Sequence, residues 1–530
     1  MKTVYTPAEI ERILEANIGP GREPDDIDDV ALLERRQLRA RFIEMVGEQS
    51  AAEVAAFHGA RSGQIVVFAG DDMCGAYALA TATSLHRRGI RAKVCLFNIG
   101  GDMLSPDTLA GRNRFVQSAG GEWLNEVVDP GASFTMPELD SEMTVVDGLF
   151  GIDYQKPLRG GYQAVARYIN ESPSTPKVVS LDIPSGMTLN LSVGMVNRNI
   201  IHADLTLAIV GPTPAFFMPE NARLIGRWKT LKLPLDKSVV KHPQFRITDA
   251  KAIRAAMPSR DPFADKNDLG CALIYAGSYG MLGAAVLATR SATRSGCGKV
   301  ICHGPRCGFY VLQSSVPSAM FETDGSDFDI QRFETQHEAD AIAVGPGLGH
   351  SDATIFGLER FLKNCQAQGR PLIIDADALN CISRRPSMID FVPAGSVITP
   401  HAREFDRLFG QQSSHSTRLL KAIEMASRYK ITIVLKGHYT FTVWPDGEVL
   451  VNASGTDALA TAGSGDVLTG LIAGLTAQHL APEVAAVAAV YLHGIAGKLA
   501  AARNGVRGTT AEDIADNVGL AIETICNPPS

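Results

Sequence analysis

A glycine-rich turn followed directly by an acid is the strongest chemical feature of the chain. Residues 462–472 read Ala-Gly-Ser-Gly-Asp-Val-Leu-Thr-Gly-Leu-Ile, and the apolar residues after Asp466 recur at helical spacing. The turn therefore opens a helix whose unpaired N–H groups suit a phosphate. We expect this helix end to keep Asp466 ionised, so that it can accept the proton of an attacking hydroxyl in phosphoryl transfer. The alternative is an acid that only caps the helix.

Five further turns follow short apolar runs in the second half of the chain. They are 276–285 (Ala-Gly-Ser-Tyr-Gly-Met-Leu-Gly-Ala-Ala), 344–349 (Val-Gly-Pro-Gly-Leu-Gly), 375–380 (Asp-Ala-Asp-Ala-Leu-Asn), 399–405 (Thr-Pro-His-Ala-Arg-Glu-Phe) and 435–440 (Leu-Lys-Gly-His-Tyr-Thr). Ligands of open α/β sheets bind at the carboxyl ends of strands, so a site is expected at these turns.

Single residues in these turns are open to more than one interpretation. A lone histidine such as His401 is more often structural, and Lys436 at a strand end would usually be a solvated charge. Asp375 and Asp377 either form turns or hold Mg²⁺ through water, and we favour the turn for Asp377.

The elements that must position these turns are predicted by the alternation of apolar runs with amphipathic segments, which indicates βα units and parallel sheets. The predicted strands are 64–69, 92–97, 143–146, 177–181 and 204–210, followed by 271–276, 299–303, 341–344, 371–375, 396–399 and 431–435. A chain of 530 residues is too long for one core. We predict two α/β domains, 1–240 and 241–530, with a helical arm over 1–55 and the boundary in the turn-rich segment 229–243.

Composition excludes several classes of function. The net charge is −7 and no long run of Lys and Arg occurs, so no nucleic-acid partner is expected. Residues 1–7 lead into a charged segment, unlike a secretory signal. The most apolar stretch, 484–501, contains His493 and Lys498 and predicts a buried core helix, not a membrane span. Nine cysteines without paired spacing predict reduced thiols and a cytoplasmic location instead of a metal site.

In their order along residues 266–499, the turns resemble the ADP-dependent NAD(P)H-hydrate dehydratases of the ribokinase-like superfamily. The resemblance implies that ADP, with Mg²⁺, phosphorylates the ring hydroxyl of hydrated NADH or NADPH, after which phosphate and AMP leave. It assigns the base to Asp466 and an anion hole to Gly463, Ser464 and Gly465. It assigns the hydrated dinucleotide to Ala284, Gly347, His401 and Asp466, and the nucleotide to Lys436, Gly437, His438, Tyr439, Thr440 and Gly465.

One loop departs from the family pattern, and one alternative function remains. Residues 456–459 read Thr-Asp-Ala-Leu where the family usually has Asn-Pro-Gly-Met, so the loop before the anion hole departs from the pattern. The alternative function is a small-alcohol kinase of the same superfamily, such as one acting on a hydroxyethylthiazole, joined to an N-terminal assembly module.

Residues from about 45 to 235 are similar to the NAD(P)H-hydrate epimerase domain, which implies a Rossmann-like parallel sheet with helices on both faces. The resemblance rests on 146–151 (Val-Asp-Gly-Leu-Phe-Gly), 181–186 (Leu-Asp-Ile-Pro-Ser-Gly) and 211–219. It implies substrate contacts at Asp71, Asp72, Gly75, Gly151 and Asp182, and K⁺ at Asp72, Asp147 and Ser185.

The first loop of this half departs from the family pattern Gly-Asn-Asn-Gly-Gly-Asp-Gly, because residues 70–76 read Gly-Asp-Asp-Met-Cys-Gly-Ala. We expect the two acids to satisfy the helix start and to repel dinucleotide phosphates, and Met73 and Cys74 to resist a tight turn. Three interpretations remain: an epimerase with compensated ligands, a degenerate domain kept for assembly and stability, which we favour, or a loop that binds something else. A homo-oligomer and no membrane partner are expected.

Overall fold

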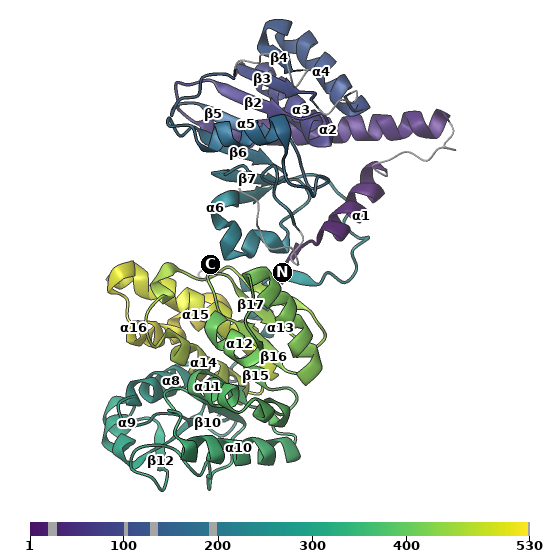
Figure 1. Ribbon diagram of the computed structural model, residues 1–530. Coiled ribbons are helices and arrows are strands. Elements are labelled where there is room, and N and C mark those ends of the chain that lie inside the picture. Colours follow the sequence, from purple (N-terminus) through teal and green to yellow (C-terminus); the bar gives the residue numbers. More distant parts are fainter. Residues whose placement is uncertain (20–28, 100–103, 128–135, 190–198, 528–530) are drawn as a thin grey trace. The chain divides into compact units, whose positions relative to one another are not determined.

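The structure is a computed structural model that describes residues 1–19, 29–99, 104–127, 136–189 and 199–527. The chain forms two compact units (Figure 1). One unit holds residues 3–243, and the other holds residues 244–530 with Met1 and Lys2. They are called the N-terminal and the C-terminal unit below.

The N-terminal unit is built on a parallel sheet of seven strands. Their order is β4 (Leu124–Val127), β3 (Ala92–Phe97), β2 (Ile65–Ala69), β5 (Thr144–Gly148), β6 (Lys177–Leu181), β7 (Leu205–Ala208) and β8 (Arg227–Thr230). The five predicted strands are present. The edge strands β4 and β8 were not predicted, because each is only partly buried and therefore mixes polar with apolar residues.

Helices cover both faces of this sheet. They are α1 (Pro7–Ile18), α2 (Asp29–His58), α3 (Met73–Arg87), α4 (Pro106–Ala119), α5 (Gly160–Asn170) and α6 (Ala222–Ile225). Helices α2, α3 and α4 pack together, with α3 against β2. Val165 and Ile169 of α5 join a core cluster with Val66 and Phe68 of β2. The predicted helical arm corresponds to α1 and most of α2; part of the acidic stretch between them lies outside the described residues.

The C-terminal unit contains a mixed sheet of eleven strands. Their order is β1 (Lys2–Val4), β9 (Phe245–Ile247), β18 (Val449–Asn452), β17 (Thr440–Val443), β16 (Thr432–Leu435), β15 (Val397–Ile398), β14 (Ile373–Ile374), β13 (Ala341–Val344), β10 (Cys271–Tyr275), β11 (Lys299–Gly304) and β12 (Met320–Thr323). From β16 to β12 every neighbouring pair is parallel, so these carboxyl ends share one edge. Strand β17 is antiparallel to β16 and to β18, and β18 is parallel to β9.

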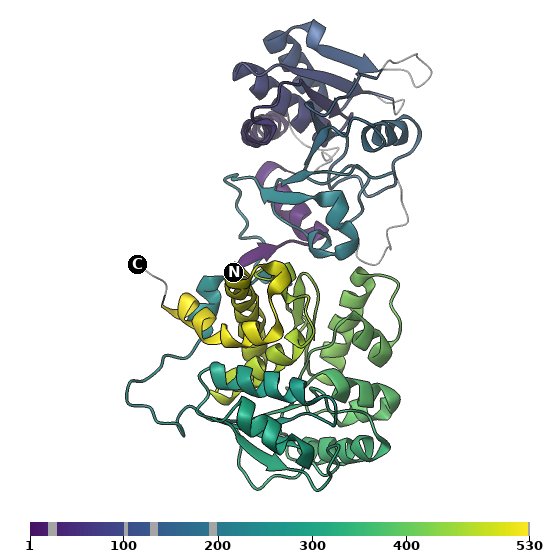
Figure 2. The same ribbon diagram turned by 90° about the vertical axis from the view of Figure 1, so that its left-hand side faces the viewer.

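The six strands predicted for this unit are present, and β14 and β15 are shorter than expected. On one face of the sheet pack α8 (Leu282–Arg294), α14 (Ser464–Ala477), α15 (Pro482–Asn504), α16 (Ala511–Asp516) and α17 (Val518–Cys526). Helices α10 (Asp352–Ala367), α11 (Ala376–Arg384), α12 (Ala402–Phe409) and α13 (His415–Tyr429) lie on the other side (Figure 2). Two short helices complete the unit, α7 (Ala250–Ala256) and α9 (Phe309–Ser315).

Helix α15 contains the most apolar stretch of the sequence. By length and composition alone it could cross a membrane, but 67% of its apolar window is buried inside the unit. Its alanines and valines join the core formed with α8 and α14. The helix therefore has the packing of the predicted core helix.

Candidate active sites

Asp375 and Lys436 form an ion pair at the carboxyl edge of the eleven-stranded sheet. Asp375 follows β14, Lys436 follows β16, and Lys436 Nζ lies 2.8 Å from Asp375 Oδ1. Thr469 of α14 donates a hydrogen bond of 2.6 Å to Asp375 Oδ2. Burial lowers the pKa of Lys436, but Asp375 and Glu404 raise it more, so the net shift is upward. Lys436 is therefore a fixed cation, and the expected solvated charge is wrong.

Asp466 lies in the first turn of α14, partly buried, and no hydrogen bond from a described residue reaches its carboxylate. Burial raises the pKa of Asp466 to about 7, and Asp375 and Asp377 push it the same way while Lys436 opposes them. Burial and the neighbouring carboxylates therefore act against the expected ionisation of Asp466 at the helix end. A carboxyl that titrates near neutral pH suits a general base.

The start of α14 depends on Gly463, the N-cap residue, which has a left-handed φ of +88°. An added Cβ there would lie 2.5 Å from Leu287 Cδ1 and 3.1 Å from Ala511 Cβ. No side chain caps this helix. The N–H of Ser464 donates to the carbonyl of Thr461, whereas the N–H groups of Gly465 and Asp466 have no acceptor among the described residues. In the predicted anion hole, the N–H groups of Gly463 and Gly465 thus have no acceptor among the described residues and can bind a ligand, and the N–H of Asp466 is a further donor beside them.

The segment that departs from the family pattern before this turn is ordered. Asp457–Leu459 form a short 3-10 helix, and Thr456 Oγ1 accepts the N–H of Ala458. Behind the turn, Ser464 Oγ lies 3.2 Å from Nε2 of the buried His493. Burial lowers the pKa of His493 to about 4, so its ring is neutral at pH 7.

His401 is the N-cap residue of α12. Its Nδ1 accepts the N–H groups of Arg403 and Glu404, and Glu404 Oε2 accepts the N–H of His401 at 2.8 Å. Burial lowers the pKa of His401, which favours the neutral ring that can accept these bonds. The structural role that a lone histidine usually has is thus confirmed for His401. Glu404 also lies 4.0 Å from Lys436 Nζ, so this cap borders the ion pair.

The turns that carry Ala284 and Gly347 interlock. A Cβ on Gly347, whose φ is +59°, would lie 3.0 Å from Ala284 Cβ and 2.5 Å from the carbonyl oxygen of Met281. Ser278 Oγ donates to the carbonyl of Gly347 at 2.9 Å. Asp377 lies in the first turn of α11 and its Oδ2 accepts the N–H of Gly349 in a separate loop, so the turn role favoured for Asp377 stays a prediction.

The predicted nucleotide segment, Lys436–Thr440, is the turn between β16 and β17. Gly437 and His438 are exposed, and the His438 ring contacts the edge of Tyr439. A Cβ on Gly465 would lie 3.4 Å from Lys436 Nζ. The structure therefore brings the nucleotide segment to the start of α14.

In the N-terminal unit, Asp147 ends β5 and is fully buried. It accepts hydrogen bonds from Ser180 Oγ, from the N–H and Oγ of Ser185, and from the N–H of Leu149. These four donors occupy the four lone-pair positions of the carboxylate. Asp147 and Ser185 are thus in direct contact, as the resemblance implies.

Asp182 lies beside Gly151. Asp182 has a left-handed φ of +66°, and its Oδ2 accepts the N–H of Ile152 at 2.9 Å. A Cβ on Gly151 would approach that oxygen to 3.0 Å. Burial raises the pKa of Asp182 to about 6. A strained backbone under a buried acid is typical of functional positions.

The first loop forms without the two family asparagines. Asp72 is the N-cap residue of α3, and its Oδ1 accepts the N–H groups of Cys74 and Gly75. Asp71 accepts the hydroxyl hydrogen of Tyr162. The expectation that Asp72 would satisfy the helix start is confirmed. Burial raises the pKa of Asp72 to about 7.

The expected strain at Met73 and Cys74 is absent. Neither residue has a positive φ, so the loop needs no left-handed backbone there. Glycine is required instead at the two ends of the loop, Gly70 and Gly75, where another part of the backbone lies too close for a side chain. A Cβ on Gly70 would lie 1.9 Å from the carbonyl oxygen of Leu149, and one on Gly75 would lie 2.0 Å from that of Gly70.

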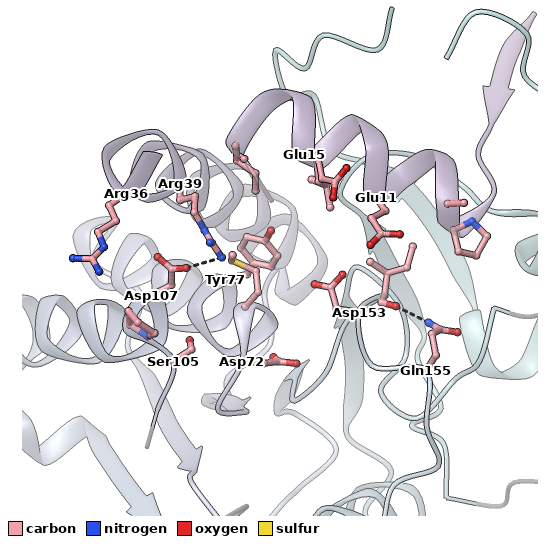
Figure 3. Close-up of a pocket in the computed structure, with 18 residues that line it drawn as sticks. Glu11, Glu15, Arg36, Arg39, Asp72, Tyr77, Ser105, Asp107, Asp153 and Gln155 are labelled. Carbon is pink, nitrogen blue, oxygen red and sulfur yellow. Dashed lines mark hydrogen bonds and ion pairs between the residues drawn. The ribbon is translucent and has the colours of Figure 1, made fainter. Parts of the chain in front are cut away.

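A cavity of about 790 Å³ lies beside this loop (Figure 3). Its charged lining comprises five carboxylates and two guanidinium groups, from Glu11, Glu15, Asp72, Asp107, Asp153, Arg36 and Arg39. Arg39 pairs with Asp107 at 3.1 Å. Burial and the carboxylate of Glu11 raise the pKa of Asp153. The cavity therefore carries an excess of negative charge.

Comparison with known proteins identifies the family. A family model described as NAD(P)H-hydrate dehydratase matches residues 272–519, and one described as YjeF-related protein N-terminus matches residues 39–215. The bifunctional NAD(P)H-hydrate repair enzyme Nnr of Moorella thermoacetica is 31% identical over 525 residues, which cover 94% of each chain. The chain belongs to this family of bifunctional NAD(P)H-hydrate repair enzymes. The relative from Salinibacter ruber is also 31% identical, over 90% of this chain and 91% of its own.

Among solved structures, the family is represented by the ADP/ATP-dependent NAD(P)H-hydrate dehydratase of Bacillus subtilis co-crystallised with ATP/Mg²⁺. It is 30% identical, covers 53% of this chain and 98% of its own, and has a TM-score of 0.44.

Two residues that border the ion pair were not predicted from the sequence. Thr469 lies within an apolar helix and Glu404 follows a capping histidine, so each has an ordinary local explanation. The sequence did contain one signal for Thr469, because its spacing of four residues from Gly465 places both on the same face of the helix. In the structure, Thr469 Oγ1 contacts the carbonyl of Gly465.

Proposed function

We propose that the C-terminal unit dehydrates the S form of hydrated NADH or NADPH, using ADP as phosphoryl donor and releasing AMP and phosphate. The observation that carries this proposal is the position of Asp466, a carboxyl with a pKa of about 7 beside free helix N–H groups and the Lys436–Asp375 pair. A base, an anion-binding helix end and a fixed cation are what phosphoryl transfer to a hydroxyl requires.

Each residue has one task in this reaction. Asp466 takes the proton of the ring hydroxyl as its oxygen attacks the β-phosphorus of ADP, and the bond from that phosphorus to the AMP oxygen breaks. Lys436, oriented by Asp375, stabilises the charge on the transferred group. The ring nitrogen then drives the carbon–oxygen bond to break, a ring proton is lost, and phosphate leaves. Positioning and charge stabilisation are sufficient for both steps.

The residues fit a divalent cation brought by the nucleotide. Asp375, Glu404 and Asp466 each raise the pKa of Lys436, and Lys436 is the cation that lowers the pKa of Asp466. Both oxygens of Asp375 are engaged by Lys436 and Thr469. Mg²⁺ would therefore be held by the nucleotide phosphates and reach the carboxylates through water, where it would neutralise charge on the transferred group.

The test supplies hydrated NADH with Mg²⁺ and either ADP or ATP and follows the absorbance of the restored reduced ring. We expect recovery with ADP, with one AMP formed per NADH. Asp466→Asn should bind ADP with unchanged affinity and lose at least about 100-fold in kcat, the usual contribution of a general base. Asp390→Asn removes an exposed carboxylate and is the matched control.

Two outcomes would contradict the proposal. Absence of recovery with either nucleotide would exclude the dehydratase, and phosphorylation of a small alcohol by ATP would then favour the kinase alternative. Full activity of Asp466→Asn would exclude Asp466 as the base.

For the N-terminal unit we propose that epimerisation of the hydrated dinucleotide is strongly reduced. The carboxylate of Asp72 is committed to the helix start, and the acidic cavity repels the substrate pyrophosphate. The resemblance implies K⁺ at Asp72, Asp147 and Ser185. The carboxylate of Asp147 already accepts four hydrogen bonds, so it has no free position for the ion. The residues do not fit K⁺ as they lie, and no step is assigned to it.

The test supplies only the stereoisomer that the dehydratase does not use. We expect the full chain to consume it at close to the spontaneous rate, with or without K⁺. Replacing both acids, Asp71→Asn with Asp72→Asn, should raise that rate, because Asn caps a helix as well as Asp does and removes the charge. Strong acceleration by the unchanged chain that disappears in Asp147→Ala would show an active epimerase.

A cytoplasmic location and assembly with further copies of the chain complete the proposal. All nine cysteines are free, which fits a reducing compartment.

A further inference from the structure

Two large aromatic side chains of the C-terminal unit are exposed as a contacting pair. Tyr279 is 71% exposed and Phe328 is 61% exposed. Their ring centroids are 5.4 Å apart at an interplanar angle of 88°, and the N–H of Tyr279 donates to the carbonyl of Phe328 at 2.7 Å. Single exposed apolar residues need no explanation, but two aromatic rings held together in water indicate a binding surface.

The pair adjoins the turns assigned to the hydrated dinucleotide. Tyr279 directly follows Ser278, whose Oγ donates to the carbonyl of Gly347. The Met281 side chain reaches back over the same turn, since its Cε lies 3.9 Å from the position of a Cβ on Gly349. Tyr279 follows β10 and Phe328 follows β12. Both rings therefore belong to loops at the carboxyl edge of the sheet.

A helix start directly follows the turn that carries Tyr279. Helix α8 begins at Leu282 and no side chain caps it. A Cβ on Gly283 would meet no atom within 4 Å, so the first turn of α8 is open. Uncapped helix N–H groups suit a pyrophosphate. The loop after β10 thus carries both an aromatic side chain and an uncapped helix start, in the same unit as Asp466.

The loop of Phe328 is held rigidly. The buried Asp324 accepts the N–H groups of Ser326 and Arg332 at 3.0 Å, and its Oδ2 lies 3.5 Å from Nε2 of the buried His303. The backbone N–H groups of Arg306 and Cys307 donate to carbonyls of the same loop. A surface fixed before a ligand arrives loses little conformational entropy on binding.

We propose that Tyr279 and Phe328 form a stacking surface for the adenine ring of the hydrated dinucleotide. The proposal rests on the dehydratase function proposed above. With the nicotinamide ring at Asp466 and the pyrophosphate at the start of α8, the adenine reaches the exposed pair. Every nucleobase has a flat face that stacks on aromatic side chains, so this pair would contribute affinity for the half of the substrate that does not react.

The experiment compares two substrates in the full-length chain at saturating ADP and Mg²⁺. One is hydrated NADH, and the other is hydrated reduced nicotinamide mononucleotide, which lacks the adenylate half. For Tyr279→Ala and Phe328→Ala we expect KM for hydrated NADH to rise about 10-fold with kcat unchanged, the loss of one base stack. KM for the mononucleotide and for ADP should not change. Tyr279→Phe keeps an aromatic ring and should rescue most of the affinity that Tyr279→Ala loses, and Phe263→Ala, which removes a 93% exposed ring, is the control.

The outcomes separate the two proposals. Equal losses with both substrates, or no loss with either, would overturn the stacking surface. A higher KM for ADP would assign the pair to the donor nucleotide instead. Altered oligomeric state in light scattering with unchanged KM would assign it to contact with a second copy. No turnover of either substrate by the unchanged chain would overturn the dehydratase function and this inference with it.

Discussion

At the scale of single residues, the candidate dehydratase site is defined by how burial changes the charge of each group. Lys436 remains a cation because Asp375 and Glu404 offset its burial. For Asp466 the charge of Lys436 does not offset burial and the neighbouring carboxylates, and the pKa rises to about 7. A base that titrates near neutral pH is strong enough to take a proton and is still partly ionised at pH 7.

The first prediction concerns the pH dependence of activity. The reaction needs ionised Asp466, so kcat/KM for hydrated NADH should fall about tenfold per pH unit below about pH 7 and level off above it. The measurement is initial rate between about pH 5.5 and 8.5. A profile that is flat down to an ordinary carboxyl pKa would contradict the assignment of Asp466 as the titrating base.

The ionisation of Asp466 that increases activity at higher pH should decrease the stability of the folded chain. The folded pKa of Asp466, about 7, lies above the ordinary value, so the folded state binds the proton more tightly. Stability from this group is full below the unfolded pKa and is lost as pH rises through about 7. Asp466→Asn, which cannot ionise, should therefore unfold at a higher temperature than the unchanged chain at pH 8, and the difference should shrink toward pH 4. A constant difference across this range would contradict the raised pKa.

A third prediction concerns the hydroxyl that holds Asp375. Thr469→Val removes the hydrogen bond of 2.6 Å to a buried carboxylate. The free energy of unfolding should fall by about 1.5–3 kcal/mol, the range for hydrogen bonds to charged groups. Thr476→Val in the same helix is the matched control, because the Thr476 hydroxyl is buried without a partner and its loss should cost little. Equal effects in denaturant titrations of the two variants would be inconsistent with this role for Thr469.

At the scale of elements, the first turn of α14 decides whether base and anion hole exist together. The sequence predicts this helix from apolar spacing and predicts its start from the glycines. It cannot show that a side chain at position 463 would collide with Leu287 and Ala511. These residues are distant in sequence and lie beside Gly463 only in the folded chain. Edge strands β4 and β8 were missed for a related reason, since their burial depends on neighbours and not on their own residues.

The fourth prediction tests this helix start. Gly463→Ala places a Cβ against Leu287 in a left-handed backbone, so it should destabilise the C-terminal unit by at least about 1 kcal/mol and lower kcat by displacing Asp466. Gly519→Ala in α17, which has an ordinary φ and no close neighbour, should be neutral or stabilising. Thermal unfolding and turnover of both variants provide the measurement. Unchanged turnover in Gly463→Ala would show that the turn tolerates a side chain.

At the scale of the whole molecule, two α/β units of similar design differ in the charge of their candidate sites. In the C-terminal unit a cation and free N–H groups are available to phosphates. In the N-terminal unit carboxylates outnumber guanidinium groups around the cavity beside the first loop. The shared architecture therefore does not imply shared capacity to bind a dinucleotide.

The fifth prediction follows from this contrast. ADP with Mg²⁺ should slow amide hydrogen exchange in the C-terminal unit, most strongly at residues 436–440 and 463–470, and should leave the N-terminal unit unchanged. At a concentration 100 times Kd, the binding adds about 2.7 kcal/mol to the stability of the unit that binds. The measurement is exchange mass spectrometry of the full chain. Protection within the N-terminal unit would place a nucleotide site there.

The sequence by itself determined the α/β class, most of the parallel strands, and the family, because hydrophobic alternation and glycine-rich turns are local properties written in consecutive residues. It also predicted which turns carry the chemistry. Only the tertiary structure decided the charge states and contacts at those turns. Lys436 became a fixed cation, Asp466 a carboxyl near neutral pKa, and Asp72 a helix cap, because each outcome depends on groups brought together from different strands and on the water excluded between them.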